Sequence, residues 1–276
     1  MKTFPLATCV TALALTSGVY GATLDSPALF RSVDYVQTGP TTIAVLWAGW
    51  SYLVRTTGDF DGGELVYPGP DSPVPLDSSA PNQLFYRSTL FPDLDALNAA
   101  APFGTYSGTG TNSVLGTSVS APDVVYSEDF WPNVPMLTSD TFTGLQGLNP
   151  ALPFTVNFTA FGTVAIEPRI ELFIYRGGIG SGQLVFSELF ASSTLTSILL
   201  PANTLEPGQL YALGLSFQNN NLPGIEGDVN FSLPTYALFN TSGPTAVPEP
   251  GTVLGGVLAL AGIVLFHRRR AAKQLS

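Results

Sequence analysis

The sequence predicts an all-β protein with two β-sandwich-like domains, one short helix in the first domain, and a transmembrane helix near the C-terminus. Three observations favour this fold class. Glycine and proline recur about every eight to twelve residues, and the runs between them are rich in Val, Ile, Thr, Phe and Tyr. Several runs alternate apolar and polar side chains, as strands with one buried face do. An uncharged stretch near the C-terminus is followed at once by arginines.

The first 21 residues have the layout of a secretory signal peptide. Lys2 is followed by an apolar stretch, and Val19 and Gly21 stand at positions −3 and −1 before Ala22, where a signal peptidase accepts small or permitted residues. The sequence therefore predicts export, with residues 1–21 removed and the folded part beginning near Ala22.

A membrane segment is predicted at residues 251–266. These 16 uncharged residues would form a helix about 24 Å long, slightly shorter than a hydrocarbon core of about 30 Å. The cluster Arg268, Arg269 and Arg270 follows directly and acts as a membrane stop, and the positive-inside bias places the basic tail, residues 267–276, in the cytoplasm. The acidic middle of the chain is then outside.

The residues just before this segment carry a sorting motif. Val247, Pro248, Glu249 and Pro250 end a linker at residues 243–250, and a short glycine-containing apolar helix and an arginine cluster follow in that order. This arrangement resembles the PEP-CTERM sorting signal of exopolysaccharide-producing bacteria. The resemblance implies recognition by an exosortase-type membrane protease and cleavage near the motif. It also implies a membrane-anchored precursor that is delivered to the cell surface or extracellular matrix, with exopolysaccharide as a partner.

The charge of the middle region excludes several kinds of chemistry. Residues 22–250 contain 20 acidic residues against five arginines, a net charge of −15, and they contain no Lys, His or Cys. The region therefore cannot form a Ser-His-Asp or Cys-His catalytic system, a His- or Cys-ligated zinc site, a Schiff base or a disulfide. Its negative field disfavours nucleic acid as a partner. No cofactor is expected, and carboxylate chemistry, calcium or contacts between aromatics and sugars remain open.

The first β domain is expected over residues 22–125. Strands are predicted at 29–37, 43–55, 63–67, 84–90, 103–107 and 113–119. A short helix is predicted near residue 95, with Asp93 as its N-cap and Pro102 as its stop. The proline-rich stretch 68–81 reads as a solvated loop. Prolines at 122, 132 and 135 mark the break between the halves.

The second half, residues 134–242, shows a clearer strand pattern, with strands predicted at 153–160, 169–175, 183–190, 195–200, 209–218 and 228–239. The glycine-rich stretch 176–182 suits a hairpin loop, because glycine tolerates positive φ. Residues 205–211 read L-x-P-G-x-x-Y, which resembles the corner between strands E and F of fibronectin type III domains. The resemblance implies that the Tyr211 hydroxyl closes the turn onto upstream backbone. The alternative is that Tyr211 is an ordinary core aromatic.

A weak candidate for calcium binding lies at residues 59–64. Asp59, Asp61 and Glu64 place three carboxylates beside a glycine-rich turn, and calcium prefers hard oxygen ligands. The series lacks the distal glutamate of an EF-hand, and a strand resumes at Glu64. A solvated hairpin is therefore the favoured interpretation, and no metal is expected.

Aromatic residues suggest two places where a sugar could stack. Glu128 and Asp129 stand beside Phe130 and Trp131, which is either a sugar site or a linker whose aromatics pack on a domain edge. Trp47 and Trp50 are three residues apart, so a strand directs them to opposite faces. At least one of them should lie in the core, and an exposed one could stack on a sugar ring.

These observations predict an exported, sortase-processed, non-catalytic β protein of the cell surface or matrix, associated with exopolysaccharide. The alternative is a secreted carbohydrate-binding or carbohydrate-active protein that uses carboxylates and exposed aromatics. A cleft with two paired acids, one of them desolvated, would favour an enzyme, whereas a convex acidic surface would favour the structural role.

Overall fold

The structure is a computed structural model that describes residues 22–80, 82–162, 167–179, 182–220 and 228–243. The expected signal peptide, the motif Val247, Pro248, Glu249 and Pro250, the expected membrane helix at 251–266 and the arginines 268–270 lie outside these residues. Within the part that the structure describes, no helix has the length and apolar character needed to cross a membrane.

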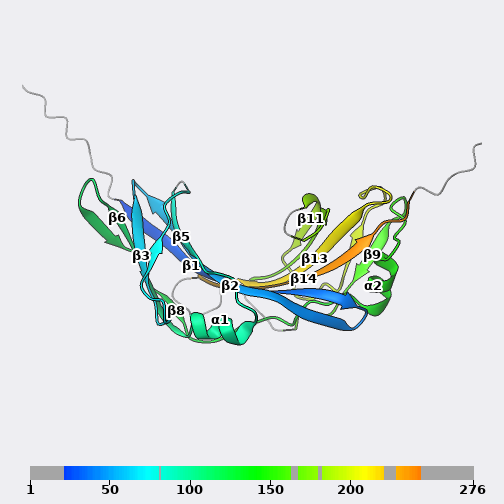
Figure 1. The fold of residues 1–276 in the computed structure, drawn as a ribbon, viewed down its shortest axis with the longest axis horizontal. Helices are drawn as coiled ribbons and strands as arrows, with labels where there is room; N and C mark the ends of the chain where they lie inside the picture. Colours follow the sequence, from blue (N-terminus) through cyan, green and yellow to red (C-terminus); the bar gives the residue numbers. More distant parts are fainter. Residues whose placement is uncertain (1–21, 81, 163–166, 180–181, 221–227, 244–276) are drawn as a thin grey trace, which may run out of the picture.

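The largest sheet has seven strands and runs across the middle of the molecule (Figure 1). Its neighbouring strands are antiparallel, except that the first and last strands of the described chain, β1 and β14, lie side by side in parallel. In spatial order the strands are β11 (Gln183–Phe190), β10 (Glu167–Arg176), β13 (Leu210–Asn220), β14 (Asp228–Asn240), β1 (Thr23–Gly39), β2 (Thr42–Thr57) and β5 (Gln83–Arg87).

Two smaller sheets make the second layer. One pairs β4 (Val74–Leu76), β3 (Gly62–Val66), β6 (Gly104–Asn112) and β7 (Thr117–Ser120), with β8 (Val124–Tyr126) also bonded to β6. The other pairs β12 (Ser197–Leu200) with β9 (Phe154–Asn157) at the opposite end of the molecule. The protein is therefore mostly β with sandwich-like packing, as the sequence predicts.

Both hydrophobic cores lie on the same face of the large sheet. Along β14, Val229 and Phe231 belong to the core at the end that holds β3 and β6, whereas Ala237 and Phe239 belong to the core at the end that holds β9. These residues all have odd numbers, and side chains two apart share a face of a strand. The even-numbered face of the same strand is consequently free for another use.

Strands of the two halves pair with each other in one sheet, which the sequence did not predict. The strands β1 and β2 come from the first half, yet β1 pairs with β14 of the second half along seven residues. Gln37, near the end of β1, is buried and exchanges two hydrogen bonds with the backbone of Leu137, at 2.9 and 3.1 Å. The regions 22–125 and 134–242 are therefore joined by one continuous sheet.

The helix near residue 95 is confirmed, and a second one is new. Helix α1 (Leu94–Ala100) begins where the Asp93 carboxylate accepts a hydrogen bond from the Ala96 amide at 2.8 Å, and it ends before Pro102. Helix α2 (Ser139–Leu145) is capped in the same way by Thr138.

The expectation of a solvated loop at 68–81 is wrong in part, because β4 lies within it and its residues Val74 and Leu76 are buried.

The open face of the large sheet is partly covered at the β13 end. The predicted alternation along β13 is confirmed for its core face, but Ala212 and Ser216 on the other face are also buried. The ring of Phe173 lies directly over Gly214 and packs against Tyr236 at a centroid distance of 5.8 Å. Large side chains from neighbouring strands thus shield the small ones, which period-two patterning does not reveal.

Candidate binding groove

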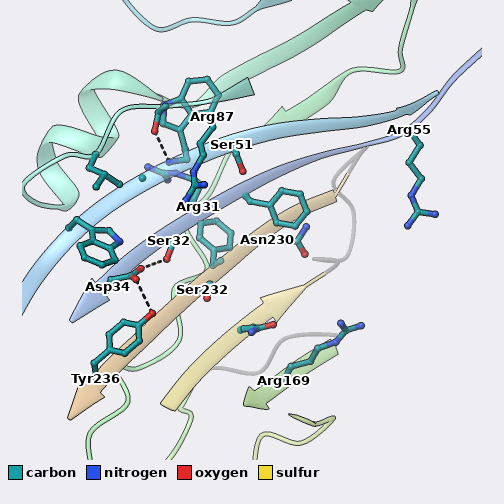
Figure 2. Close-up of a pocket in the computed structure, with 18 residues that line it drawn as sticks. Arg31, Ser32, Asp34, Ser51, Arg55, Arg87, Arg169, Asn230, Ser232 and Tyr236 are labelled. Carbon is teal, nitrogen blue, oxygen red and sulfur yellow. Dashed lines mark hydrogen bonds between the residues drawn. The ribbon is translucent and has the colours of Figure 1, made fainter. Parts of the chain in front are cut away.

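A groove of about 780 Å³ lies on the open face of the large sheet. The central strands form its floor, and the arc of the molecule rises at both ends of them (Figure 1). Figure 2 shows its side chains, which come from β1, β2, β5, β10, β13 and β14 and from the segment just after β5. Both cores occupy the opposite face, so the lining residues other than Arg31, Trp50 and Phe231 lie outside the cores.

Short polar side chains make up the floor. They are arranged in rows by the strand register, which sets Ser51 opposite Phe30 and Phe30 opposite Asn230, and sets Ser32 opposite Ser232. Gln218 continues the second row, because it lies opposite Ser232 on one side and Arg169 on the other. Hydroxyls and amides both donate and accept hydrogen bonds, so this floor suits a ligand that is rich in such groups.

Four of the five arginines of the middle region contribute to the groove. Arg55 on β2 and Arg87 on β5 lie on one side of the floor strands and Arg169 on β10 lies on the other, while Arg31 is buried beneath the floor (Figure 2). Arg169 forms an exposed ion pair with Glu167 at 3.3 Å. Within the described residues no ion pair involves Arg55 or Arg87. Most of the few positive charges of a strongly acidic region are therefore gathered at this place.

Apolar surfaces also face the groove. Phe30 is 41% exposed and Leu90 is 61% exposed, and the half-buried Trp47 lies close to both Asp34 and the floor. Trp50, by contrast, is buried in the core on the opposite face, where it packs against Tyr67 and Tyr106. The expectation that the two tryptophans point to opposite faces, with one in the core, is confirmed.

Within the part of the chain that the structure describes, Asp34 is the only carboxylate among the residues that line the groove. It accepts hydrogen bonds from the Ser32 hydroxyl at 2.6 Å and from the Tyr236 hydroxyl at 3.4 Å (Figure 2). Burial raises the pKa of its side chain above the usual aspartate value, and these hydrogen bonds oppose the shift in part. The groove therefore holds one desolvated acid without a second carboxylate in its lining.

Arg31 lies beneath the floor of the groove, where it is held by side chains of the core. Its side chain is fully buried, and it donates to the Asp129 carboxylate at 2.9 Å and to the Asn98 side chain at 2.5 Å. Its guanidinium lies over the ring of Tyr126 at 4.6 Å and over that of Trp131 at 5.5 Å. Burial lowers the pKa of Arg31, and the charge of Asp129 works against that shift.

This arrangement decides between the two interpretations of residues 128–131. Asp129 is bonded to Arg31, and Trp131 packs edge-on against Phe231 at a centroid distance of 4.8 Å. Phe130 contributes a backbone carbonyl that accepts from Asn219 at 2.5 Å, and Glu128 is exposed. The segment is a linker that packs on the sheet, so its interpretation as a sugar site is wrong.

The residues of the calcium candidate do not converge. The Asp61 carboxylate accepts hydrogen bonds from the backbone and hydroxyl of Ser113, which lower the pKa of Asp61. Glu64 is exposed on β3, and the Asp59 backbone carbonyl accepts from Asn112. Among the residues that the structure describes, no three acidic side chains are grouped to hold a metal ion. The turn is instead built by hydrogen bonds between neighbouring loops.

The Tyr211 corner is present. The Tyr211 hydroxyl is buried and accepts a hydrogen bond from the Glu206 amide at 2.8 Å, five residues upstream. Gly208 has φ of +69°, which allows the turn between them. The hydroxyl meets a backbone donor here rather than an acceptor. This contact lies far from the groove and belongs to the fold.

Comparisons with known proteins do not assign a family. No family model matches the chain, and no characterised relative is found. Solved structures with some likeness include the FN1–FN3 domains of chicken CNTN1, with 12% identity over 83% of this chain and 70% of that one, at a TM-score of 0.27. A tandem repeat from the extending region of a large adhesion protein has 13% identity over 78% of this chain and 50% of that one, at a TM-score of 0.23. A mutant of Salmonella alpha-2-macroglobulin has 15% identity over 82% of this chain and 16% of that one, at a TM-score of 0.22. Likeness at these scores does not define a shared fold.

The sequence alone did not locate the groove. Trp47 was singled out, but the arginines and the serines were not, because the rows that unite them depend on the pairing of β1 with β14. These strands are about 200 residues apart, and their parallel register has no local signal. One usable signal was present: the few arginines of an acidic chain are scarce enough for each position to matter.

Proposed function

We propose that the chain is an exported, exosortase-processed, non-catalytic β protein that serves at the cell surface or in the matrix and associates with exopolysaccharide. The sorting motif at residues 247–250 supports the route, and the groove supports binding. The observation that favours binding over catalysis is that, among the described residues, Asp34 is the only carboxylate that lines the groove. Glycoside hydrolysis ordinarily needs two carboxylates that flank the bond to be cleaved.

A carbohydrate-active enzyme is the second candidate. Two observations favour it: Asp34 is desolvated with a raised pKa, and Trp47 faces the same groove. A raised pKa suits a general acid. The second acid would have to come from outside the lining, and Glu171, whose carboxylate accepts a hydrogen bond from the groove residue Gln218 at 3.2 Å, is one such group. Incubation of the exported protein with its host's polysaccharide should release no new reducing ends. Release that disappears in Asp34→Asn would establish the enzyme instead.

Localisation tests the proposed route. We expect the wild-type protein in the surface or matrix fraction of an exosortase-bearing host and in the membrane fraction of the same host without exosortase. Glu249→Gln alters the sorting motif and should shift the protein to the membrane fraction. Glu128→Gln removes the same charge at an exposed position of the linker and should leave the distribution unchanged. Release that does not depend on exosortase would contradict the proposal.

A further inference from the structure

We propose that the groove binds a segment of an acidic polysaccharide, with the carboxylates of the ligand at the arginines and its sugar rings against Trp47 and Phe30. This inference names a ligand for the groove and rests on the proposed function in one respect, that the ligand is met outside the cell. It partly reverses the argument from net charge, which disfavours anionic partners.

The distribution of charge is the first step. Residues 22–250 carry few positive charges, yet the side chains of Arg55, Arg87 and Arg169 all line one groove. Neither Arg55 nor Arg87 forms an ion pair with a described residue, so both are available to a ligand. At physiological salt the Debye length is about 8 Å, so a bound group senses these arginines more than the distant carboxylates. Guanidinium groups match carboxylates in geometry.

The floor between the arginines is the second step. Ser32, Ser51 and Ser232 offer hydroxyls, and Asn230 and Gln218 offer amides, all within the same lining. Asp34 adds an acceptor that Ser32 and Tyr236 hold in place. A carboxylate of the ligand would be repelled by Asp34, so this part of the groove suits uncharged hydroxyls. The two sides of the floor suit the charged groups.

The apolar surfaces are the third step. The exposed ring of Phe30 and the half-buried ring of Trp47 stand beside the polar floor. Sugar rings have an apolar face of C–H groups and an edge of hydroxyls, so they need both kinds of surface together. A combination of aromatic faces, hydroxyls and amides, and separated arginines fits a chain of acidic sugars.

Other polyanions fit this groove less well. An extended peptide usually binds by adding a strand to a sheet edge, but the floor strands β1, β14 and β13 are each paired on both sides. Nucleic acid has a dense phosphate backbone, whereas the arginines here are few and lie on either side of the floor strands, and the same groove holds the carboxylate of Asp34. Acidic polysaccharide has sparser charge and many neutral hydroxyls between the charges.

The test measures binding of uronate oligosaccharides to the protein as recovered from the exported fraction. The probes are an oligogalacturonate, an oligomannuronate and the methyl ester of the oligogalacturonate, which keeps the sugar and removes the charge. We expect binding of at least one acid oligomer, weakened about tenfold or more by esterification and falling steadily as salt rises.

Three variants localise the binding. The double variant Arg55→Gln with Arg87→Gln should weaken binding about tenfold or more. Trp47→Ala should weaken the ester and the acid alike. The matched control is Arg176→Gln, because Arg176 is the arginine outside the groove, where it pairs with Glu206 at 2.6 Å. It should change affinity less than about twofold. Circular dichroism and thermal melting establish that each variant is folded.

Several results would overturn the inference. They are failure of both acid oligomers to bind, equal binding of acid and ester, or equal loss of binding in Arg176→Gln and in the double variant. Polyglutamate or single-stranded DNA that binds as tightly as the uronates at the same arginines would assign the groove to another class of ligand. None of these results affects localisation, so failure of this inference is separable from failure of the proposed function.

Discussion

Tyr211→Phe is expected to destabilise the protein by about 1 kcal/mol. The substitution removes one hydroxyl, which is buried and accepts from the Glu206 amide at 2.8 Å. Phenylalanine keeps the ring, so the stacking on Phe239 at a centroid distance of 5.6 Å is preserved. What remains is a partly buried N–H without its acceptor, and such a loss typically costs about 1 kcal/mol when water can reach the donor.

The size of this effect is limited by a second contact. Thr241 holds the same turn, because its hydroxyl donates to the Glu206 carbonyl at 2.7 Å and accepts from the Gln209 amide at 3.0 Å. The turn should therefore keep its shape in Tyr211→Phe, and the loss should be local. For a chain of this size the expected fall in Tm is about 2 to 4 °C.

Equilibrium unfolding in urea is the assay, and Tyr175→Phe is the control. Tyr175 is half-buried on β10, and its hydroxyl has no hydrogen-bond partner among the described residues. The same atom is thus removed from the same residue type without the corner. The reasoning predicts a lower urea midpoint for Tyr211→Phe than for Tyr175→Phe at an unchanged slope. Equal midpoints would show that Tyr211 is ordinary packing and would refute the corner as a source of stability.

Three further predictions concern charged side chains. Burial raises the pKa of folded Asp34, so the folded state binds the proton more tightly than the unfolded state. The free energy of unfolding should therefore fall as pH rises from about 4 toward the folded pKa. Urea unfolding at several pH values should show this slope in the wild type and lose it in Asp34→Asn. Asp129→Ala should lower the free energy of unfolding by about 2 kcal/mol, because it leaves the buried Arg31 without its carboxylate; the partial exposure of Asp129 keeps the loss from being larger. Adding Arg31→Met to Asp129→Ala should recover part of this stability. If it recovers none, the ion pair is not the cause of the loss. Calcium should raise Tm little or not at all, and a rise of many degrees that vanishes in Asp61→Ala would contradict the loop hydrogen bonds to Ser113 as the role of that carboxylate.

Local features of the fold were predictable because each has a local cause. The helix at residue 95 follows from a capping aspartate and a following proline, and the corner at Tyr211 follows from a seven-residue motif with a turn-forming glycine. Strands β11, β10 and β13 were found within two residues of their observed ends, because apolar and β-branched residues alternate between clear turns. Short strands such as β4, only three residues long, give too little pattern to be recognised.

The candidate site was less predictable because it depends on contacts that are distant in sequence. The parallel pairing of β1 with β14 brings Ser32 opposite Ser232 and thereby makes a floor from two ends of the chain. Arg31 shows the second difficulty. An arginine in a strand reads as a solvated residue, but here aromatic rings, Asp129 and Asn98 surround it in the core. Only tertiary packing distinguishes it from Arg55 or Arg87.

The intact mass of the released protein tests the proposed export and processing most directly. The proposal places the cleavage near the sorting motif at residues 247–250, so processing can be read from the mass of the released chain. From an exosortase-bearing host, the released protein should have a mass that corresponds to a chain beginning near Ala22 and ending close to Pro250. A released protein whose mass still includes residues 251–276, with Arg268 and Lys273 attached, would contradict the account and make the apolar segment a lasting part of the mature chain.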